Sequence, residues 1–434
     1  MRTSLRGIAN KARTDPKHRF RNLWQLLNVE GLLSSWRYVN KRSAGGVDRV
    51  SAREYGKNLA ANVMSLVERL KRGSYRARLV GRKTIPKSDG GVRPLGLPVV
   101  EDKLLQRCAS RILEAIFEPA FLPCSYAYRQ GRNALQAVRS LTQELQFGCY
   151  GYVVEVDIKG FFDHIDHDWM LRMLRQRVDD RPFLRLIEKW LKAGILEEDG
   201  KVIHPQTGCP QGGVISPVLA NIYLHYVLDL WFEKVVRPRC RARAYMIRFA
   251  DDVVFAFQHR HEAERFYRVV GKRLAKFGLE ISAKKSCITR FSRFQLGQRS
   301  KGFEFLGFEF RWVPDRQGVP RVTKRTAPSR LRRALRDFTE WAKDQRHTRM
   351  RDLMATYRSK LRGHYNYFGV IRNYASLQVY YTQTRRILRK WLNRRSQRRS
   401  YNWRGYKAML LHFRVPKPRI TEVRCRQLVL ETSC

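Results

Sequence analysis

The chain has 434 residues, of which 43% are hydrophobic, so it can bury a substantial core divided among two or three subdomains. No apolar run approaches the length of a membrane span, and residues 1–20 lack the apolar centre of a signal peptide. The 87 Lys and Arg residues exceed the 38 Asp and Glu residues by 49 charges, which favours a nucleic acid over a membrane surface as partner, because neutralised phosphates release counterions.

The N-terminal residues 1–74 are predicted to be helical. Leucines over 20–40 recur at roughly helical spacing. Ser51, followed three residues later by Glu54, forms a capping box that predicts one long helix ending at Gly73.

Residues 75–312 are predicted to form one α+β domain with an antiparallel sheet. Residues 75–98 are expected to form two strands around a Ser-Asp-Gly-Gly turn. The short apolar run 150–158 is typical of a buried strand, and 217–236 is expected to be a long apolar helix. Residues 244–258 predict a hairpin whose turn holds two adjacent aspartates.

Beyond the sheet domain the chain is predicted to be helical. Apolar side chains recur at helical spacing over 331–341, 350–361 and 387–392, which is typical of faces that pack in a core. Basic residues surround the last of these faces, and no acidic residue occurs between Tyr381 and Arg404. Because a solvated helix normally mixes both signs, this surface is expected to bind RNA or DNA. The residues assigned to it are Arg385, Arg386, Arg389, Arg394, Arg395, Arg398 and Arg399.

The hairpin RFADDVVF carries the adjacent carboxylates Asp251 and Asp252. A turn alone accounts for aspartates there, but burying two carboxylates together raises both repulsion and desolvation. If the hairpin pairs beside the strand 150–158, Asp157 at the end of that strand joins them at one edge of the sheet. Hard oxygen ligands select Mg²⁺, and a pair of such ions can activate a 3′-hydroxyl and stabilise a leaving pyrophosphate.

Five blocks appear in the order found in reverse transcriptases: VEVDIKGFF, GCPQGGVISPVLANIYL, RFADDVVF, FGLEISAKKS and FEFLGFEF. IPKSDGGVRPLGLP and SYAYRQGRNALQA precede them, and KLRGHYNYFG and WLNRRSQRRSYNW follow. With these additions the chain resembles a bacterial group II intron-encoded reverse transcriptase/maturase over nearly its whole length. FADD in place of the commoner YADD, and SYAYRQGRNA in place of SYGFRPGRSA, are its departures from the usual pattern.

The resemblance implies a right-hand polymerase fold with an α-helical thumb. The N-terminal extension is expected over 1–74, the fingers and the palm with its antiparallel sheet over 75–312, and the thumb or maturase domain over 313–420. The tail 421–434 is expected to hold no endonuclease domain, so insertion would use other primers, such as nascent strands at replication forks.

The resemblance also implies roles for single residues. Asp157 and Asp251 correspond to the two metal-binding aspartates of the palm, and Asp252 to a third, more peripheral acid. Ile158 would lend its backbone carbonyl to the metal. Phe162 stands where the family places an aromatic steric gate, which excludes a 2′-hydroxyl and so selects deoxynucleotides.

Contacts to the nucleotide are implied at four further positions. Gln211 lies in a glycine-bearing loop that touches the incoming nucleotide and the template. Lys87 and Arg93 fall in the block where the fingers grip the triphosphate. Lys285 lies where a lysine protonates pyrophosphate, with the neighbouring Lys284 as a rival and a solvated surface as the plain alternative for each of these basic residues.

The function implied is that of an RNA-directed DNA polymerase that binds group II intron RNA, assists its splicing and copies it into cDNA during retrohoming. The expected cofactor is a pair of Mg²⁺ ions. The expected partners are the intron RNA, an RNA template with a DNA primer, deoxynucleoside triphosphates and target DNA, in a bacterial cytoplasmic ribonucleoprotein without a membrane. An intron-free reverse transcriptase in DNA repair or phage defence, a non-catalytic RNA-binding splicing factor, and the oligomeric state stay open.

Two other sequence features are expected to carry no metal. The cluster DHIDHDW (163–169) resembles a metal site, but Asp166 or His167 is expected to cap the next helix instead. The eight cysteines are scattered singly without a CxxC pair, which argues against a zinc ribbon or a disulfide framework and fits the reduced thiols of a cytosol.

Overall fold

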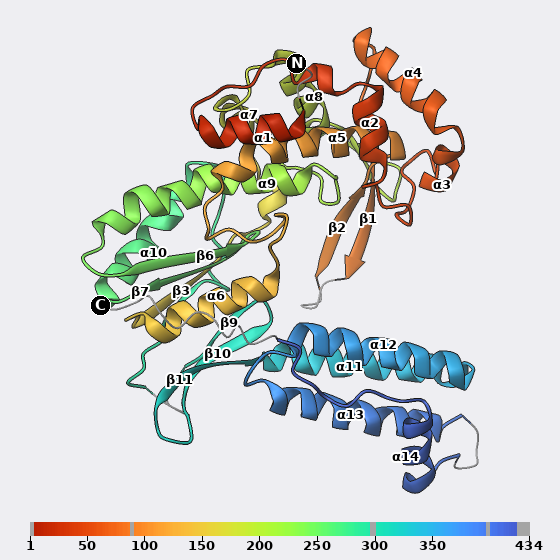
Figure 1. Ribbon diagram of the computed structural model, residues 1–434, viewed down its shortest axis with the longest axis vertical. Coiled ribbons are helices and arrows are strands. Elements are labelled where there is room, and N and C mark those ends of the chain that lie inside the picture. The colour runs from red at the N-terminus through yellow and green to blue at the C-terminus, as the bar shows by residue number, and fades with distance from the viewer. Residues whose placement is uncertain (1–3, 87–90, 296–300, 396–399, 423–434) are drawn as a thin grey trace. The chain divides into compact units, whose positions relative to one another are not determined.

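The computed structural model describes residues 4–86, 91–295, 301–395 and 400–422 (Figure 1). The chain divides into two compact units. The first comprises Met1–Ala137 and Val154–Ile288, and the second Val138–Val153 and Thr289–Cys434. Lys87, Arg398 and Arg399 lie outside the described residues.

The N-terminal part of the first unit is helical, as predicted. Its helices are α1 (Leu5–Thr14), α2 (Val29–Trp36), α3 (Ala52–Tyr55) and α4 (Leu59–Lys71). The Ser51 hydroxyl caps α3 by accepting from the Glu54 amide at 3.1 Å. The prediction of one long helix from this cap is wrong, because the 3₁₀ turn Gly56–Asn58 separates α3 from α4. Gly and Asn are both poor formers of an α-helix interior.

A small mixed sheet follows in the order β2-β1-β4-β5. The predicted pair of strands is confirmed, since β1 (Val80–Pro86) and β2 (Val92–Leu97) are antiparallel with Gly81 opposite Leu97. One pair departs from the expected antiparallel arrangement, because β4 (Ile195–Leu196) joins β1 in parallel. The short β5 (Val202–Ile203) then pairs antiparallel with β4.

The second sheet has the order β6-β7-β3-β8. The buried strand and the hairpin predicted from the sequence are confirmed as β3 (Tyr152–Asp157), β6 (Ala244–Phe249) and β7 (Asp252–Phe257). The last strand is β8 (Cys287–Arg290).

Helices around these sheets supply much of the core of the first unit. They are α5 (Val100–Phe117), α7 (His167–Arg175), α8 (Arg181–Leu191), α9 (Ser216–Leu224) and α10 (Arg260–Ala275). All of α9 except Pro217 is buried. The long helix predicted over 217–236 continues after α9 as two π-helical segments, His225–Asp229 and Phe232–Val236. Such π segments are frequent at functional sites.

The second unit contains a three-stranded antiparallel sheet and a group of helices. The sheet order is β11-β10-β9, built from β9 (Phe303–Phe305), β10 (Phe308–Pro314) and β11 (Pro320–Thr326). The helices are α11 (Pro328–Asp344), α12 (Met350–Phe368), α13 (Tyr374–Leu392) and α14 (Trp403–His412). The helix α6 (Ala134–Phe147) begins in the first unit and runs into the second.

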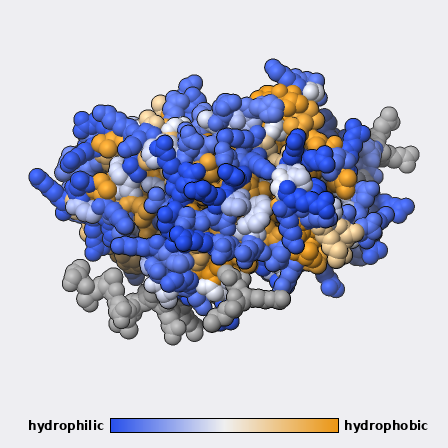
Figure 2. Space-filling view, turned by 90° about the horizontal axis from the view of Figure 1, so that it is seen from above, coloured by the Kyte–Doolittle hydropathy of each residue, from blue (hydrophilic) through white to orange (hydrophobic). Residues whose placement is uncertain are grey.

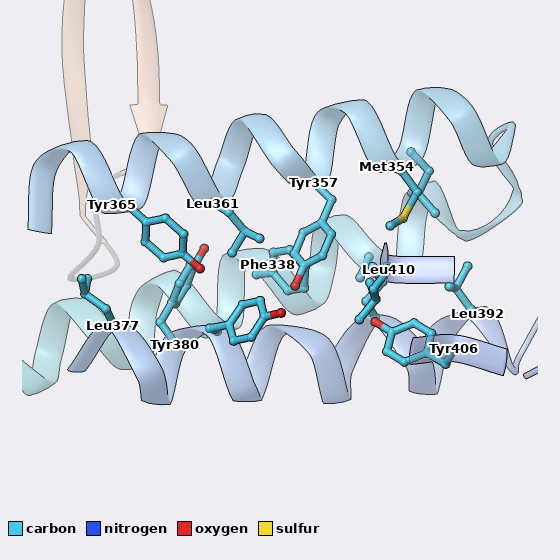
Figure 3. Packing of buried hydrophobic residues seen from close by; sticks show 14 residues of the cluster. Phe338, Met354, Tyr357, Leu361, Tyr365, Leu377, Tyr380, Leu392, Tyr406 and Leu410 are labelled. Carbon is cyan, nitrogen blue, oxygen red and sulfur yellow. The ribbon is translucent and has the colours of Figure 1, made fainter. Parts of the chain in front are cut away.

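The helices α11 to α14 share one core, which Figure 3 shows at close range. The three apolar faces predicted from helical spacing are confirmed, because each contributes side chains to this core. Its buried members include Phe338, Leu353, Met354, Tyr357, Leu361, Leu388 and Leu392. Buried tyrosines from α12, α13 and α14 add aromatic area to it.

The surface agrees with the composition. Most residues on the face seen in Figure 2 are hydrophilic, and apolar residues form patches among them. Within the described part of the chain, no helix is long and apolar enough to cross a membrane. The six cysteines described there carry free thiols.

Candidate functional site

The turn between β6 and β7 carries the adjacent aspartates. Phe249 pairs with Asp252, so Ala250 and Asp251 form a two-residue hairpin loop. Ala250 has a φ of 58°, which costs an L-residue about 1 kcal/mol and is usually left to glycine. Asp251 is half-buried and Asp252 is exposed. The two carboxylates therefore occupy different environments although they are neighbours in the chain.

The strand that ends at Asp157 lies beside this hairpin. In the sheet β3 is the neighbour of β7, so the pairing on which the predicted carboxylate cluster depends is present. The Asp157 amide donates to the Ser286 hydroxyl at 3.0 Å, and the Ser282 amide donates to the Asp157 carbonyl at 2.8 Å. The SAKKS segment is thus hydrogen-bonded to the backbone of the strand end.

The backbone after Asp157 directs one carbonyl away from that segment. Ile158 forms an antiparallel bridge with Ile281. The hydrogen bonds on either side of this bridge are made by the Asp157 carbonyl, which accepts from Ser282, and by the Lys159 amide, which donates to the Glu280 carbonyl at 2.9 Å. In a pair of this kind the peptide groups of the bridged residue itself point to the opposite side. The Ile158 carbonyl therefore faces away from the 280–282 segment.

The donors of this region suit a hard cation. Among the described residues, no group of three or more His, Cys, Asp or Glu side chains is arranged to hold a metal ion. The expected convergence of Asp157, Asp251 and Asp252 on one metal site is therefore wrong for the described residues. The ligand set that the resemblance implies is smaller and consists of the carboxylates of Asp157 and Asp251 with the Ile158 carbonyl. All of these donors are oxygens, which fits Mg²⁺, an ion that usually keeps several waters and takes one or two carboxylates.

Two residues of the DHIDHDW cluster (163–169) make structural contacts. Asp166 caps α7, because its side chain accepts from the Trp169 amide at 2.8 Å. The His167 Nε2 atom lies 2.7 Å from the Gly208 carbonyl oxygen. The helix cap is confirmed, and the imidazole fixes a neighbouring loop.

Phe161 and Phe162 follow Asp157 in a short 3₁₀ helix, Phe161–Asp163. Phe161 is 2% exposed and makes an edge contact with Tyr223, so it takes the core position. Phe162 is only partly buried and makes an edge contact with Phe161 at 5.2 Å between ring centroids. A purely structural core role therefore falls to Phe161, and the ring of Phe162 lies nearer the surface.

A cavity of about 310 Å³ opens between the β1–β2 hairpin, the 3₁₀ helix and the loop that contains Gln211. The Cys209 amide donates to the Phe162 carbonyl at 2.7 Å, which fastens this loop to the 3₁₀ helix. Arg82 on the cavity wall is paired with Glu197 at 2.6 Å.

The glycines of this loop permit a close approach of two backbones. The Gly96 amide on β2 donates to the Gln211 carbonyl. Gly212 has a φ of 105°, and a Cβ atom there would overlap the Gly96 carbonyl. Glycine is therefore required at this position both by conformation and by space.

The basic residues expected to contact the nucleotide lie on two different elements, the strand β2 and the segment before Ser286. Arg93 lies on β2 opposite Ile85. Lys284 and Lys285 are both exposed, and they directly precede Ser286, which binds the Asp157 amide. This places the two lysines on the segment that is attached to the expected metal site.

Arg248 is a residue that sequence reasoning missed. It is 0% exposed in β6, and its Nε and Nη2 atoms donate to the two carboxylate oxygens of Asp229 at 2.8 and 2.6 Å. Its remaining bonds go to the Asn221 side chain, the Ser125 hydroxyl and the Ala250 carbonyl, at 3.1, 2.9 and 3.1 Å. All five N–H donors of the guanidinium are used.

The charge of this arginine is compensated inside the protein. Burial lowers the pKa of the Arg248 guanidinium, but the charge and hydrogen bonds of Asp229 outweigh burial and raise that pKa above its ordinary value. The available signal was a basic residue inside the apolar strand AYMIRF, because a buried arginine requires an acidic partner.

The predicted RNA-binding arginines of the second unit fall into two groups. Arg386 and Arg394 are exposed, and Arg394 also lies over the ring of Trp391, 5.4 Å from its centroid. Arg385 and Arg389 lie over the rings of Tyr381 and Trp403, at 5.2 and 4.2 Å from their centroids. Arg395 donates to the Thr348 carbonyl at 3.0 Å. The exposed pair therefore offers its guanidinium groups to solvent most openly.

The sequence of the chain is similar to those of known proteins. Residues 85–310, just over half of the chain, match the family described as "Reverse transcriptase (RNA-dependent DNA polymerase)". Protein YkfC of Escherichia coli (strain K12) is 34% identical over 245 residues, which cover 54% of this chain and 64% of that protein. The group II intron-encoded protein LtrA of Lactococcus lactis subsp. cremoris is 40% identical over 173 residues, which cover 39% of this chain and 28% of that protein.

A plant relative is more distant. Nuclear intron maturase 1, mitochondrial, of Arabidopsis thaliana is 33% identical over 95 residues, which cover 22% of this chain and 13% of that protein. The chain thus spans less than two thirds of the length of each of these relatives.

Proposed function

Because the chain belongs to the reverse transcriptase (RNA-dependent DNA polymerase) family, we propose that it is an RNA-directed DNA polymerase whose Asp157 and Asp251 hold a pair of Mg²⁺ ions. The observation that carries this proposal is the sheet order. The strand β3, which ends at Asp157, is the neighbour of β7, and Asp251 lies in the turn directly before β7. This arrangement supports a shared metal site at the edge of the sheet.

In the proposed reaction the primer 3′-oxygen forms a bond to the α-phosphorus of the nucleotide, and the bond to the pyrophosphate oxygen breaks. The ions, when bound, supply activation of the 3′-hydroxyl and neutralise charge on the leaving group. Asp157, Asp251 and the Ile158 carbonyl would hold them, with Asp252 as a peripheral acid. Lys285 would donate a proton to the departing pyrophosphate.

Selection of the nucleotide is assigned to the 3₁₀ helix and the glycine loop. The partly buried ring of Phe162 would lie under the sugar and exclude a 2′-hydroxyl. Gln211, on the wall of the 310 Å³ cavity, would contact the incoming nucleotide and the template. Arg93, with Lys87, would grip the triphosphate.

The intron-associated role is proposed from the relatives and the charge. One relative is named a group II intron-encoded protein and another an intron maturase. We infer that this chain binds group II intron RNA, assists its splicing and copies it into cDNA at a target DNA, in a cytoplasmic ribonucleoprotein. The net charge of +49 and the exposed Arg386 and Arg394 support a polyanionic partner. Residues 1–74, 75–312 and 313–420 would be the extension, the fingers with the palm, and the thumb.

Primer extension on an RNA template tests this proposal, with deoxy- and ribonucleotides supplied in parallel. Asp251→Ala is expected to reduce cDNA synthesis by about 10³-fold or more, because it removes a metal ligand. Binding of RNA, measured by filter retention, should stay near the wild-type value.

The matched control is Asp199→Ala, which changes an exposed aspartate in the loop between β4 and β5 and should leave extension unchanged. Retained cDNA synthesis in Asp251→Ala would contradict the metal assignment. Absence of extension by the wild type with deoxynucleotides would contradict the polymerase activity itself.

A further inference from the structure

We propose that Arg248 and Asp229 are positioning residues for the metal-binding turn, because the buried guanidinium fixes the backbone that carries Asp251. This inference rests on the proposed function, in which Asp251 is a metal ligand. Neither Arg248 nor Asp229 would touch the metal or the nucleotide. They would act through the Ala250 carbonyl, which accepts from Arg248 Nη1 at 3.1 Å.

The turn needs such support because its conformation is unfavourable. Ala250 has a positive φ of 58° and precedes Asp251 directly. A side-chain donor on the Ala250 carbonyl holds this peptide in one orientation, and the next residue in the chain is the expected metal ligand. Backbone strain of this kind persists only where the surrounding contacts determine it.

The guanidinium is itself held on every side. Asp229, in the π-helical segment after α9, binds it in a bidentate manner, and Asn221 on α9 accepts at 3.1 Å. A lysine has one point charge and no planar fork, so it cannot reproduce this set of contacts. The π-helical segment places the Asp229 carboxylate where both of its oxygens meet the guanidinium.

The network extends to a segment far away in the sequence. The Arg248 amide donates to the Cys124 carbonyl at 2.8 Å, and the Tyr126 amide donates to the Arg248 carbonyl at 3.0 Å. Ser125 accepts from Arg248 Nη2 at 2.9 Å. The SYAYR segment is therefore tied through Arg248 to the turn of Asp251. A displacement of this segment would reach the expected metal ligand through one residue, Arg248.

The test compares metal binding with folding. Arg248→Lys, Ser125→Ala and the control Arg177→Lys are prepared in the full chain. Arg177 is another buried arginine of the first unit, 5% exposed, and it donates to backbone carbonyls of residues 12, 15 and 18. Mn²⁺ affinity is measured by electron paramagnetic resonance in the complex with primer–template and a non-hydrolysable nucleotide. Melting temperature and the Mg²⁺ dependence of extension are measured alongside.

Arg248→Lys is expected to weaken Mn²⁺ binding about tenfold, the scale at which groups that orient a metal ligand act. It should raise the half-saturating Mg²⁺ concentration by a similar factor. Ser125→Ala should shift both in the same direction by a smaller factor, with little change in melting temperature. Arg177→Lys should lower the melting temperature and leave both metal constants at the wild-type value.

Wild-type metal constants in Arg248→Lys would overturn the positioning role. Should that variant fail to fold, unchanged metal constants in Ser125→Ala would overturn it instead. Asp251→Ala separates this inference from the proposed function. If Asp251→Ala keeps extension and Mn²⁺ affinity, the metal assignment fails, whereas loss of both there with no change in Arg248→Lys contradicts the positioning role alone.

Discussion

Two adjacent phenylalanines illustrate how burial divides the roles of neighbouring residues. Phe161 is 2% exposed and packs in the core, whereas Phe162 is only partly buried in the same 3₁₀ turn. Phe162→Ala is expected to lower the preference for deoxy- over ribonucleotides about 10–100-fold in kcat/KM, because it removes the ring that we propose excludes the 2′-hydroxyl. Single-nucleotide extension with each nucleotide type measures this preference.

Phe161→Ala is the matched control for that prediction. It removes a fully buried ring and is expected to reduce the free energy of unfolding by about 3 kcal/mol or more. The sugar preference of the enzyme that remains folded should be unchanged. A similar loss of sugar preference in both variants would mean that Phe162 acts only through packing.

For single residues, the sequence could predict those features that depend on a local pattern of neighbouring residues. An apolar run ending in Asp157 and a hairpin holding Asp251 are local patterns, and the structure contains the strand and the hairpin. The network around Arg248 was not predicted, because Ser125, Asn221 and Asp229 lie 123, 27 and 19 residues away. Such partners are brought together only by the tertiary fold.

At the level of elements, the glycine loop and the β1–β2 hairpin meet where there is no space for a side chain. Gly212→Ala is expected to raise the KM for deoxynucleotides about tenfold, because the added Cβ displaces the loop from Gly96 by steric overlap and strain. Steady-state extension kinetics measure this change.

Gly200→Ala controls for the cost of a positive φ alone. Gly200 has a φ of 87°, but nothing lies within 4 Å of an added Cβ atom. This variant should be slightly destabilised and keep the wild-type KM. An equal KM in Gly212→Ala and the wild type would show that the loop tolerates displacement from Gly96.

Most of the long helices could be predicted from the sequence, but the breaks and irregular turns within them could not. The apolar faces of α11, α12 and α13 follow from spacing alone and are confirmed in one core. The break at Gly56–Asn58 and the π-helical segments after α9 were not predicted. The first π-helical segment carries Asp229, whose pairing with Arg248 is a tertiary contact that no local pattern predicts. The two-residue strands β4 and β5 are too short to give a periodic pattern.

At the scale of the whole molecule, the net charge indicates the class of partner, and the exposed basic side chains indicate which surface contacts it. Replacing both Arg386 and Arg394 by Ala is expected to weaken RNA binding and to reduce the slope of log affinity against log salt by about 1–2, as fewer counterions are released. Binding titrations over a range of salt concentrations measure the slope.

The control replaces Arg265 and Arg268, which are exposed on α10, and so removes the same charge from another surface. Its slope should stay close to that of the wild type. If the slope falls equally in both double variants, RNA is attracted by the general charge of the protein, and Arg386 and Arg394 have no special part in binding.

The contact between Gly96 and Gln211 has a consequence for motion. The two backbones are joined by a hydrogen bond and leave no room for a Cβ atom at Gly212, so sliding of the β1–β2 hairpin past the glycine loop would break this bond. A swing of the hairpin that keeps this contact would carry the wall of the 310 Å³ cavity with it. Opening and closing of this cavity would be a rigid-body movement whose hinges lie outside the contact.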